Sequence, residues 1–135
     1  MHPALVALFL VVHAAIHLSY LSPRPMATAA GPTWPFDLRR SWILSPLGAP
    51  DAATRALGLA LVALTMAGFL LAASVVLGLA PSGLWLPAIT IGAVASMGVL
   101  VLFFHPWLVV GVVVDVFLLF VVLAGGWSPD TTLFG

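Results

Sequence analysis

Four apolar stretches, each long enough to cross a lipid bilayer, make up most of this 135-residue chain. A bilayer core about 30 Å thick requires about 20 predominantly apolar residues in a helix. Hydrophobic residues account for 63% of the chain and charged residues for 6%. A soluble domain carries roughly a quarter charged residues. The sequence therefore predicts an integral membrane protein.

Proline, glycine and polar residues bound these stretches and place the expected spans at about residues 3–21, 51–79, 84–104 and 107–124. The spans lack the two-residue alternation of barrel strands, so only helices can satisfy their backbone in lipid. We expect an all-α, four-helix transmembrane bundle that forms a single domain over residues 1–135. The first span is expected to be retained, because Met1-His2-Pro3 lacks the positively charged start of a signal peptide.

The basic residues are confined to one part of the chain. All four arginines lie after the first span and before or at the start of the second, at Arg24, Arg39, Arg40 and Arg55. The positive-inside rule then predicts a multi-pass protein of the cell membrane, with loop 22–50 in the cytoplasm and both termini outside. Four basic residues, balanced by four acidic ones, are too few to bind nucleic acid.

The loop between the first two spans is expected to be amphipathic and to lie at the membrane interface. Residues 34–44 mix tryptophan with arginine, a combination that suits the headgroup layer. We expect Arg39, Arg40 and Trp107 to contact this interface. The loop is interpreted either as a surface anchor or as a lid, in which Trp34 and Trp42 close the cytoplasmic mouth of the bundle over a ligand.

Three ionisable residues stand inside the spans: His13 and His17 in the first, and Asp115 in the fourth. Such residues are costly in lipid and usually face the bundle interior with a partner. A rise of 1.5 Å per residue places Asp115 and His13 each about 12 Å from the cytoplasmic edge. His13, His17 and Tyr20 share one helix face, so we expect that face to meet the fourth span.

This polar cluster admits several interpretations. His13, His17 and Asp115 could form a buried structural hydrogen bond, an acid–base couple, or a site that recognises a ligand without chemistry. The same three residues would also be the candidate ligands of a metal ion, although no glutamate follows His13 as in the H-E-x-x-H motif. Haem b is a further alternative, but the other nearby histidine, His105, is expected at the membrane edge.

Small residues repeat at helical spacing in the two middle spans and are expected to allow close helix packing. They are Ala56/Ala60, Ala63/Ala67 and Gly68/Ala72 in the second span, and Ala88, Gly92 and Ser96 in the third.

The layout resembles that of small bacterial four-helix membrane proteins of the DoxX-like kind. The first span ends in His13-x-x-x-His17-Leu-x-Tyr20, an amphipathic loop with Trp34-Pro35 and Trp42 follows, and three more spans complete the chain. The resemblance implies a bundle with an apolar pocket near the first span. Some members of this group are linked to quinone-coupled oxidation, and distant relatives handle sterols or other lipids.

The sequence therefore suggests binding of a lipophilic small molecule, such as a quinone, an isoprenoid or a sterol-like lipid. Apolar walls with a few convergent polar groups are what such a pocket requires. His13, His17 and Asp115 are the candidate catalytic residues, and Tyr20, Trp34 and Trp42 the candidate ligand contacts. The alternatives are a non-enzymatic subunit that packs against other membrane subunits or its own copies, and a metal or haem protein. No sequence motif selects a cofactor.

Overall fold

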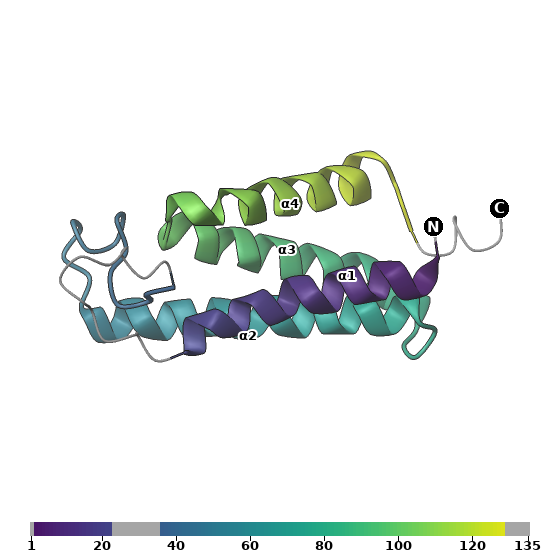
Figure 1. Ribbon diagram of the computed structural model, residues 1–135, viewed down its shortest axis with the longest axis horizontal. Helices are drawn as coiled ribbons and strands as arrows, with labels where there is room; N and C mark the ends of the chain where they lie inside the picture. Colours follow the sequence, from purple (N-terminus) through teal and green to yellow (C-terminus); the bar gives the residue numbers. More distant parts are fainter. Residues whose placement is uncertain (1, 23–35, 129–135) are drawn as a thin grey trace.

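The computed structural model describes residues 2–22 and 36–128, and the regular elements of these ranges are all helical (Figure 1). In chain order the elements are α1 (Pro3–Ile16), η1 (His17–Leu21), α2 (Asp51–Val76), η2 (Ser82–Leu84), α3 (Trp85–Leu102), η3 (Pro106–Leu108), α4 (Val109–Leu119) and η4 (Phe120–Ala124). The η elements are 3-10 turns, except that η4 is a π-helical turn.

Four helical segments are long and apolar enough to cross a membrane, as the sequence predicts. They cover Pro3–Leu21, Asp51–Val76, Ser82–Leu102 and Pro106–Ala124. The ends differ from the expected spans by no more than three residues, mainly because the second helix ends at Val76 and is followed by a glycine turn at Gly78. The all-helical prediction is confirmed, and the four long apolar helices suggest a multi-pass membrane protein.

The helices lie side by side in an elongated bundle, with α1 alongside α2 and α3 alongside α4 (Figure 1). The closest packing is between α2 and α3. Within the described ranges, α1 and α4 make hardly any close backbone contact. The bundle is therefore tightly closed on one side and open on the other.

Two glycines explain why α2 and α3 pack so closely. A Cβ atom added to Gly68 would lie 2.5 Å from the backbone of Gly92, so the two helices touch backbone to backbone. Ala72 and Ala88 are buried nearby. The predicted small-residue contact is correct for this set. It is wrong for Ala56, Ala60, Ala63 and Ala67, which are exposed.

The loop after residue 36 is attached to the end of α3. The Ser41 hydroxyl donates a hydrogen bond of 2.6 Å to the Leu102 carbonyl, and the Trp42 indole N–H donates one of 2.7 Å to the Val101 carbonyl. The last carbonyls of a helix have no partner within the helix, so side-chain donors stabilise this end. Leu38 is buried beside Gly58 and Phe103 and fixes the loop against α2 and α3.

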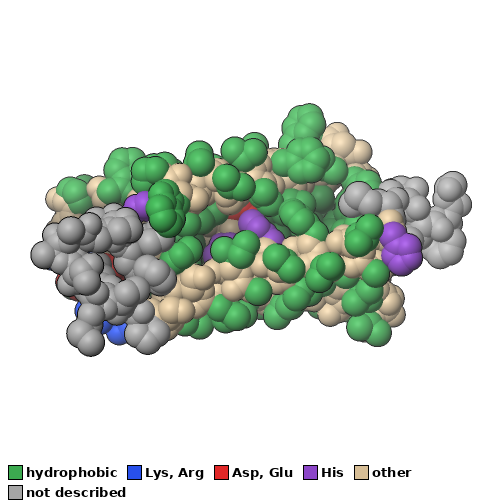
Figure 2. Space-filling view, viewed as in Figure 1, with side chains coloured by type: hydrophobic (Ala, Val, Ile, Leu, Met, Phe, Trp, Pro, Cys, Tyr) green, Lys and Arg blue, Asp and Glu red, His purple; other side chains and the backbone are tan. Residues whose placement is uncertain are grey.

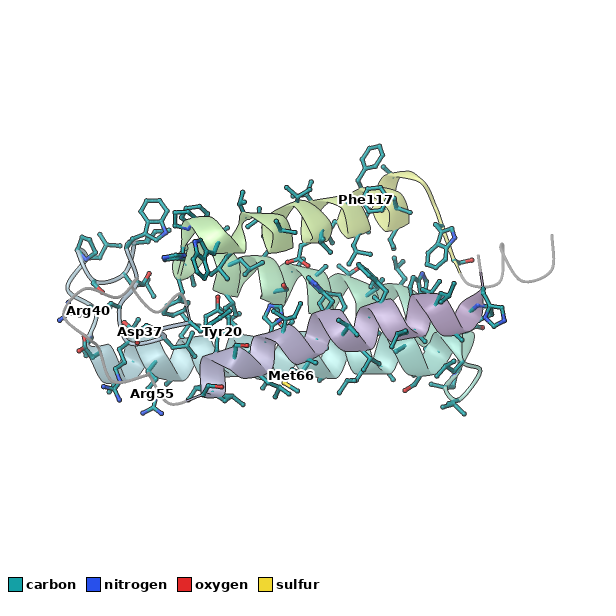
Figure 3. All side chains as sticks on the ribbon, viewed as in Figure 1. Tyr20, Asp37, Arg40, Arg55, Met66 and Phe117 are labelled. Atoms are coloured by element: carbon teal, nitrogen blue, oxygen red, sulfur yellow. The ribbon has the colours of Figure 1, made fainter. Side chains whose placement is uncertain are left out.

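Charged residues of the loop and of the start of α2 lie together at one end of the bundle. Figure 3 shows Asp37, Arg40 and Arg55 together at the end opposite the N-terminus. Arg39 and Arg40 are exposed, as expected for residues at an interface. At the α3–η3 turn, the His105 ring accepts a hydrogen bond from the Trp107 backbone N–H and caps the short 3-10 turn.

Candidate functional site

The buried polar cluster predicted from the sequence forms between α1 and α4. Nε2 of His13 lies 2.9 Å from Oδ1 of Asp115. Asp115 is fully buried and His13 almost so. The expectation that the face of α1 bearing His13 meets the fourth span is therefore correct for this pair.

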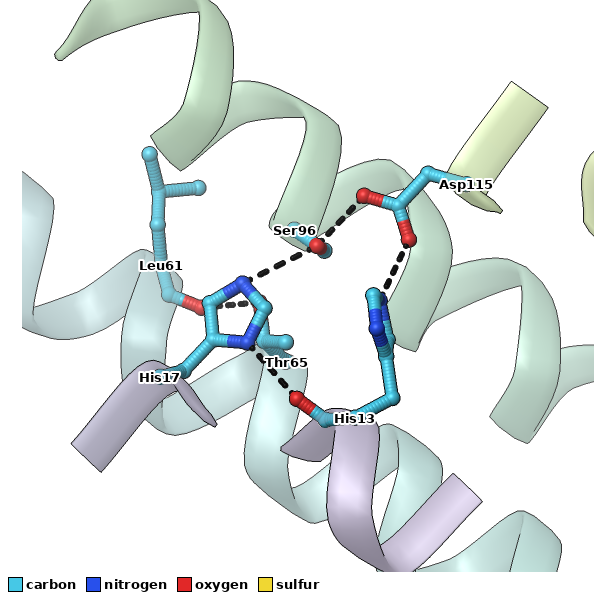
Figure 4. Close-up of polar contacts among 6 residues, drawn as sticks. All are labelled: His13, His17, Leu61, Thr65, Ser96 and Asp115. Atoms are coloured by element: carbon cyan, nitrogen blue, oxygen red, sulfur yellow. Dashed lines mark hydrogen bonds and ion pairs between the residues drawn. The ribbon is translucent and has the colours of Figure 1, made fainter. Parts of the chain in front are cut away.

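A serine that the sequence analysis assigned only to packing completes the cluster. Ser96 of α3 is fully buried, and its Oγ lies 2.5 Å from Oδ2 of Asp115 and 3.0 Å from Nε2 of His17 (Figure 4). Its position in the small-residue stripe of α3 concealed this role. The polar partners of Ser96 come from α4 and η1, and sequence spacing within one helix cannot reveal a contact between helices.

His17 is positioned by a change of helix type. The α1 helix ends at Ile16 and continues as the 3-10 turn η1, which begins at His17. Nδ1 of His17 donates a hydrogen bond of 3.1 Å to the His13 carbonyl, one turn earlier. The side chain thus satisfies a backbone acceptor at the helix end. The other ring nitrogen faces Ser96, so both nitrogens of His17 are used.

A cavity of about 300 Å³ adjoins this cluster. Its size lies at the small end of the range for ligand pockets, which is about 300–1,000 Å³. Its walls come from α1, η1, the loop, the end of α3, η3 and α4. They are formed by Phe9, Val12, His13, Ile16, His17, Tyr20, Phe36, Leu100, Trp107, Leu108, Val110, Gly111 and Val114. The walls are apolar except for the two histidines, the Tyr20 hydroxyl and the Trp107 indole.

The cavity opens sideways between α1 and α4. Several of its wall residues are also exposed on the outer surface, among them Ile16 at 52%, Val110 at 69% and Trp107 at 71%. Figure 2 shows histidine and acidic side chains at the bottom of a hollow that hydrophobic side chains surround. For a bundle in a membrane, this opening faces the acyl chains.

Tyr20 is a buried residue of the cavity wall whose hydroxyl donor is not used by any described residue. Its side chain is 6% exposed, and its hydroxyl has no hydrogen-bond partner within residues 2–22 and 36–128. The ring packs edge-on against Phe36, with ring centroids 5.2 Å apart, and its centroid lies 6.2 Å from that of the His17 ring. Figure 3 shows Tyr20 near the loop end of the bundle. A buried hydroxyl without a partner is costly unless a water or a ligand completes it.

The other predicted site residues lie in different places. Trp42 is not among the described residues that form the cavity walls, since its indole is held by Val101 and its ring is 63% exposed. Trp107, expected only as an interface residue, is part of the wall. Trp34 lies outside the described residues. Phe36, two residues later, packs edge-on against Tyr20 and forms part of the cavity wall.

The arrangement of the cluster bears on the metal alternative. His13 contacts Asp115 directly, whereas His17 reaches the carboxylate through Ser96. Among residues 2–22 and 36–128, no three histidine or acidic side chains converge as metal ligands would. The histidine and carboxylate atoms are instead hydrogen-bonded to one another. The predicted trio is brought together, but in the geometry of a proton-sharing network.

Comparisons with family models, with curated proteins and with solved structures found no match for this chain.

Proposed function

We propose that this protein binds a lipophilic small molecule, with an uncharged oxygen-bearing head, in the cavity between α1 and α4. The candidates are a quinone, an isoprenoid or a sterol-like lipid. The observation that supports this most strongly is the buried Tyr20 hydroxyl, an unused donor on the wall of an otherwise apolar cavity. A carbonyl, ether or hydroxyl oxygen of a ligand would complete it.

The charges around the cavity favour a neutral head. No arginine of the described ranges belongs to the cavity wall, so a phosphate or carboxylate head would find no permanent cation there. Burying such an unpaired charge costs several kcal/mol. A neutral head in the cavity, with its tail leaving through the opening between α1 and α4, avoids this cost and matches the apolar rim.

The second polar contact would come from His13. Its Nε2 is taken by Asp115, and no described residue is hydrogen-bonded to its Nδ1. If Nε2 carries the proton and donates to Asp115, Nδ1 is an acceptor. A ligand hydroxyl would then donate to His13 while another oxygen accepts from Tyr20. His13, His17 and Asp115 would be the groups that exchange a proton with such a ligand.

We further propose a cytoplasmic position for loop 22–50, because all the arginines lie in or beside it. Both termini would then lie outside the cell membrane. The DoxX-like resemblance agrees with a pocket beside the first span, which is where the cavity lies. In this orientation the cavity occupies the cytoplasmic half of the bilayer, with Phe36 and Trp107 toward its cytoplasmic end.

Native mass spectrometry of the purified protein tests this proposal. Decylubiquinone, farnesol and cholesterol represent the three ligand classes, and hexadecane and palmitate serve as apolar and anionic controls. We expect one bound molecule from at least one of the three uncharged oxygenated probes, and weaker adducts with both controls. Equal adducts with all five compounds, or no adduct with any of the three probes, would contradict the proposal.

A matched pair of variants identifies the binding place. Val114→Phe fills the cavity from its wall, whereas Val113→Phe adds the same volume to a side chain that is 62% exposed. Binding should be lost in the first variant and retained in the second. Loss of binding in both variants, or in neither, would indicate that the ligand binds outside this cavity.

The accessory-subunit alternative is favoured by a specific feature of α4, which packs mainly on α3 and leaves most of its surface exposed. In that case a transmembrane helix of a partner would fill the space between α1 and α4. The protein would then purify with a second chain and bind none of the three probes. Crosslinks from Val110 would join it to that chain.

A further inference from the structure

The hydrogen-bond chain from Asp115 through Ser96 to His17 determines how many protons it can hold. His17 Nδ1 faces the His13 carbonyl, which can only accept, so Nδ1 must carry a proton. Ser96 has one hydroxyl proton but contacts two groups, Asp115 Oδ2 and His17 Nε2. At least one of its two contacts must therefore be made by a proton that belongs to the partner group.

At zero net charge, two proton arrangements of Asp115, Ser96 and His17 satisfy every contact. In the first, Ser96 donates to an ionised Asp115, and a doubly protonated His17 donates from Nε2 to Ser96. In the second, Asp115 is protonated on Oδ2 and donates to Ser96, which donates to a neutral His17. In both, His13 Nε2–H donates to Asp115 Oδ1. A neutral His13 protonated on Nδ1 would instead need the carboxyl proton on Oδ1. At zero net charge His17 is then neutral, and no proton is left for the contact between Ser96 and His17.

We propose that Ser96 is a proton relay between Asp115 and His17, and that this trio holds one transferable proton at zero net charge. In the transfer, the Oδ2–H bond of Asp115 and the O–H bond of Ser96 break. An O–H bond to Ser96 and an N–H bond to His17 Nε2 form. The products are a carboxylate and an imidazolium, so the step needs no outside donor or acceptor.

The surroundings explain why this arrangement suits a membrane. An isolated charge at mid-bilayer costs on the order of 3 kcal/mol, whereas either form of the trio is neutral overall. The facing groups are His13 and Tyr20 from the first span and Thr65 of α2, whose hydroxyl donates to the Leu61 carbonyl (Figure 4). Among the described residues, no charged side chain of α2 faces the trio, so His13 is the nearest other group able to take up its proton.

The relay can be tested without any ligand, on protein in lipid nanodiscs at neutral pH. The infrared difference between the wild type and Asp115→Asn isolates the Asp115 carboxyl band. The ¹⁵N NMR spectrum of histidine-labelled protein, assigned with His17→Phe, gives the protonation of each His17 nitrogen. We expect either a protonated carboxyl with a neutral His17, or an ionised carboxyl with a doubly protonated His17. An ionised Asp115 beside a neutral His17 would overturn the proposal.

Variants separate a relay from a purely structural contact. Asp115→Asn mimics the protonated acid, since the amide oxygen can accept from His13 and the amide NH₂ can donate to Ser96. We therefore expect a neutral His17 with an accepting Nε2 in this variant. Ser96→Ala should break the link and yield the ionised carboxyl beside a neutral His17, whereas Ser96→Thr should keep the wild-type pattern. A wild-type pattern in Ser96→Ala would exclude the relay. If Ser96→Ala does not fold, the protonation states of Asp115 and His17 in the wild type, and of His17 in Asp115→Asn, still test the relay.

This test is independent of the proposed function. Failure to bind any lipophilic probe would leave the protonation of the trio unchanged, and an incorrect proton count would leave the cavity intact.

Discussion

The two sides of this bundle are both built from apolar helices but pack in opposite ways. Between α2 and α3, glycine meets glycine and the backbones touch. Between α1 and α4, bulky side chains frame a cavity, and four ionisable or hydroxyl side chains meet beside it, namely His13, His17, Ser96 and Asp115. In lipid, close packing depends on small residues rather than on hydrophobicity. The difference indicates that the α2–α3 side holds the bundle together, while the α1–α4 side is left open for a polar site.

Different interactions stabilise the two sides of the bundle. The α2–α3 side relies on dispersion between closely spaced atoms, which is lost when a side chain forces the helices apart. The α1–α4 side relies on the hydrogen bonds of Asp115, which link α1 and α3 to α4. Substitutions on the two sides should therefore differ in kind as well as in size.

The largest effect is expected from Asp115→Ala. Removing the carboxyl leaves His13 and Ser96 without their buried partner, and breaking a buried pair typically costs about 3–5 kcal/mol. The free energy of unfolding, measured by denaturant titration in mixed micelles, should fall by about that amount. Asp115→Asn is the matched control and should lose far less, because its amide can bond to both neighbours. Equal losses in the two variants would contradict the network.

A smaller loss is expected from Gly68→Ala. The added methyl would clash with the backbone of Gly92, and overpacking of this kind costs about 1–3 kcal/mol. Gly98→Ala makes the same chemical change on α3, where the new Cβ would lie 3.4 Å from a Leu61 methyl group, an ordinary contact. The unfolding free energy of Gly98→Ala should stay unchanged or rise. An unchanged unfolding free energy in Gly68→Ala would show that α2 and α3 are less tightly packed than described.

The contact between Ser41 of the loop and the end of α3 should contribute less to stability than the two preceding contacts. Ser41→Ala removes the donor to the Leu102 carbonyl and the acceptor for the Ile43 and Leu44 backbone N–H groups. We expect a loss of about 1 kcal/mol in unfolding free energy, together with faster hydrogen exchange of the amides in residues 41–45.

The control for this variant is Ser82→Ala, which makes the same chemical change at an exposed serine in the turn between α2 and α3. It should leave both the unfolding free energy and the exchange of residues 41–45 unchanged. Unaltered exchange in Ser41→Ala would show that the loop does not depend on this anchor.

Tyr20→Phe is expected to cost no stability. Its hydroxyl has no partner among the described residues, so its removal breaks no hydrogen bond with them, and the unfolding free energy of the ligand-free protein should stay unchanged or rise by about 1 kcal/mol. Affinity for an oxygenated probe should nevertheless fall about three- to tenfold, the value of one hydrogen bond. A loss of stability without a loss of affinity would show that the hydroxyl serves the fold rather than a ligand.

The fold was predictable because membrane spans are read from composition and length alone. The positions of proline and glycine placed the ends of all four spans within a few residues, and the alignment of His13 with Asp115 followed from helical rise. The role of Ser96 was not predictable in the same way. A serine in a row of small residues looks like a packing residue, and its polar partners come from two other helices.

The small alanines of α2 illustrate the same limit. Ala56, Ala60, Ala63 and Ala67 have the spacing of a helix contact but are exposed, because Gly68 already determines which face of α2 meets α3. Likewise, the choice of aromatic residue over Tyr20 depended on the path of the loop. Phe36 takes this position, while Trp42 is held by a carbonyl at the end of α3.

If the space between α1 and α4 holds a lipophilic molecule in the living membrane, that molecule should purify with the protein. Mass spectrometry can compare the small molecules extracted from the purified wild type, Val113→Phe and Val114→Phe. We expect one neutral oxygenated lipid, present in the wild type and in Val113→Phe and depleted in Val114→Phe. The same lipid content in all three proteins would contradict this expectation.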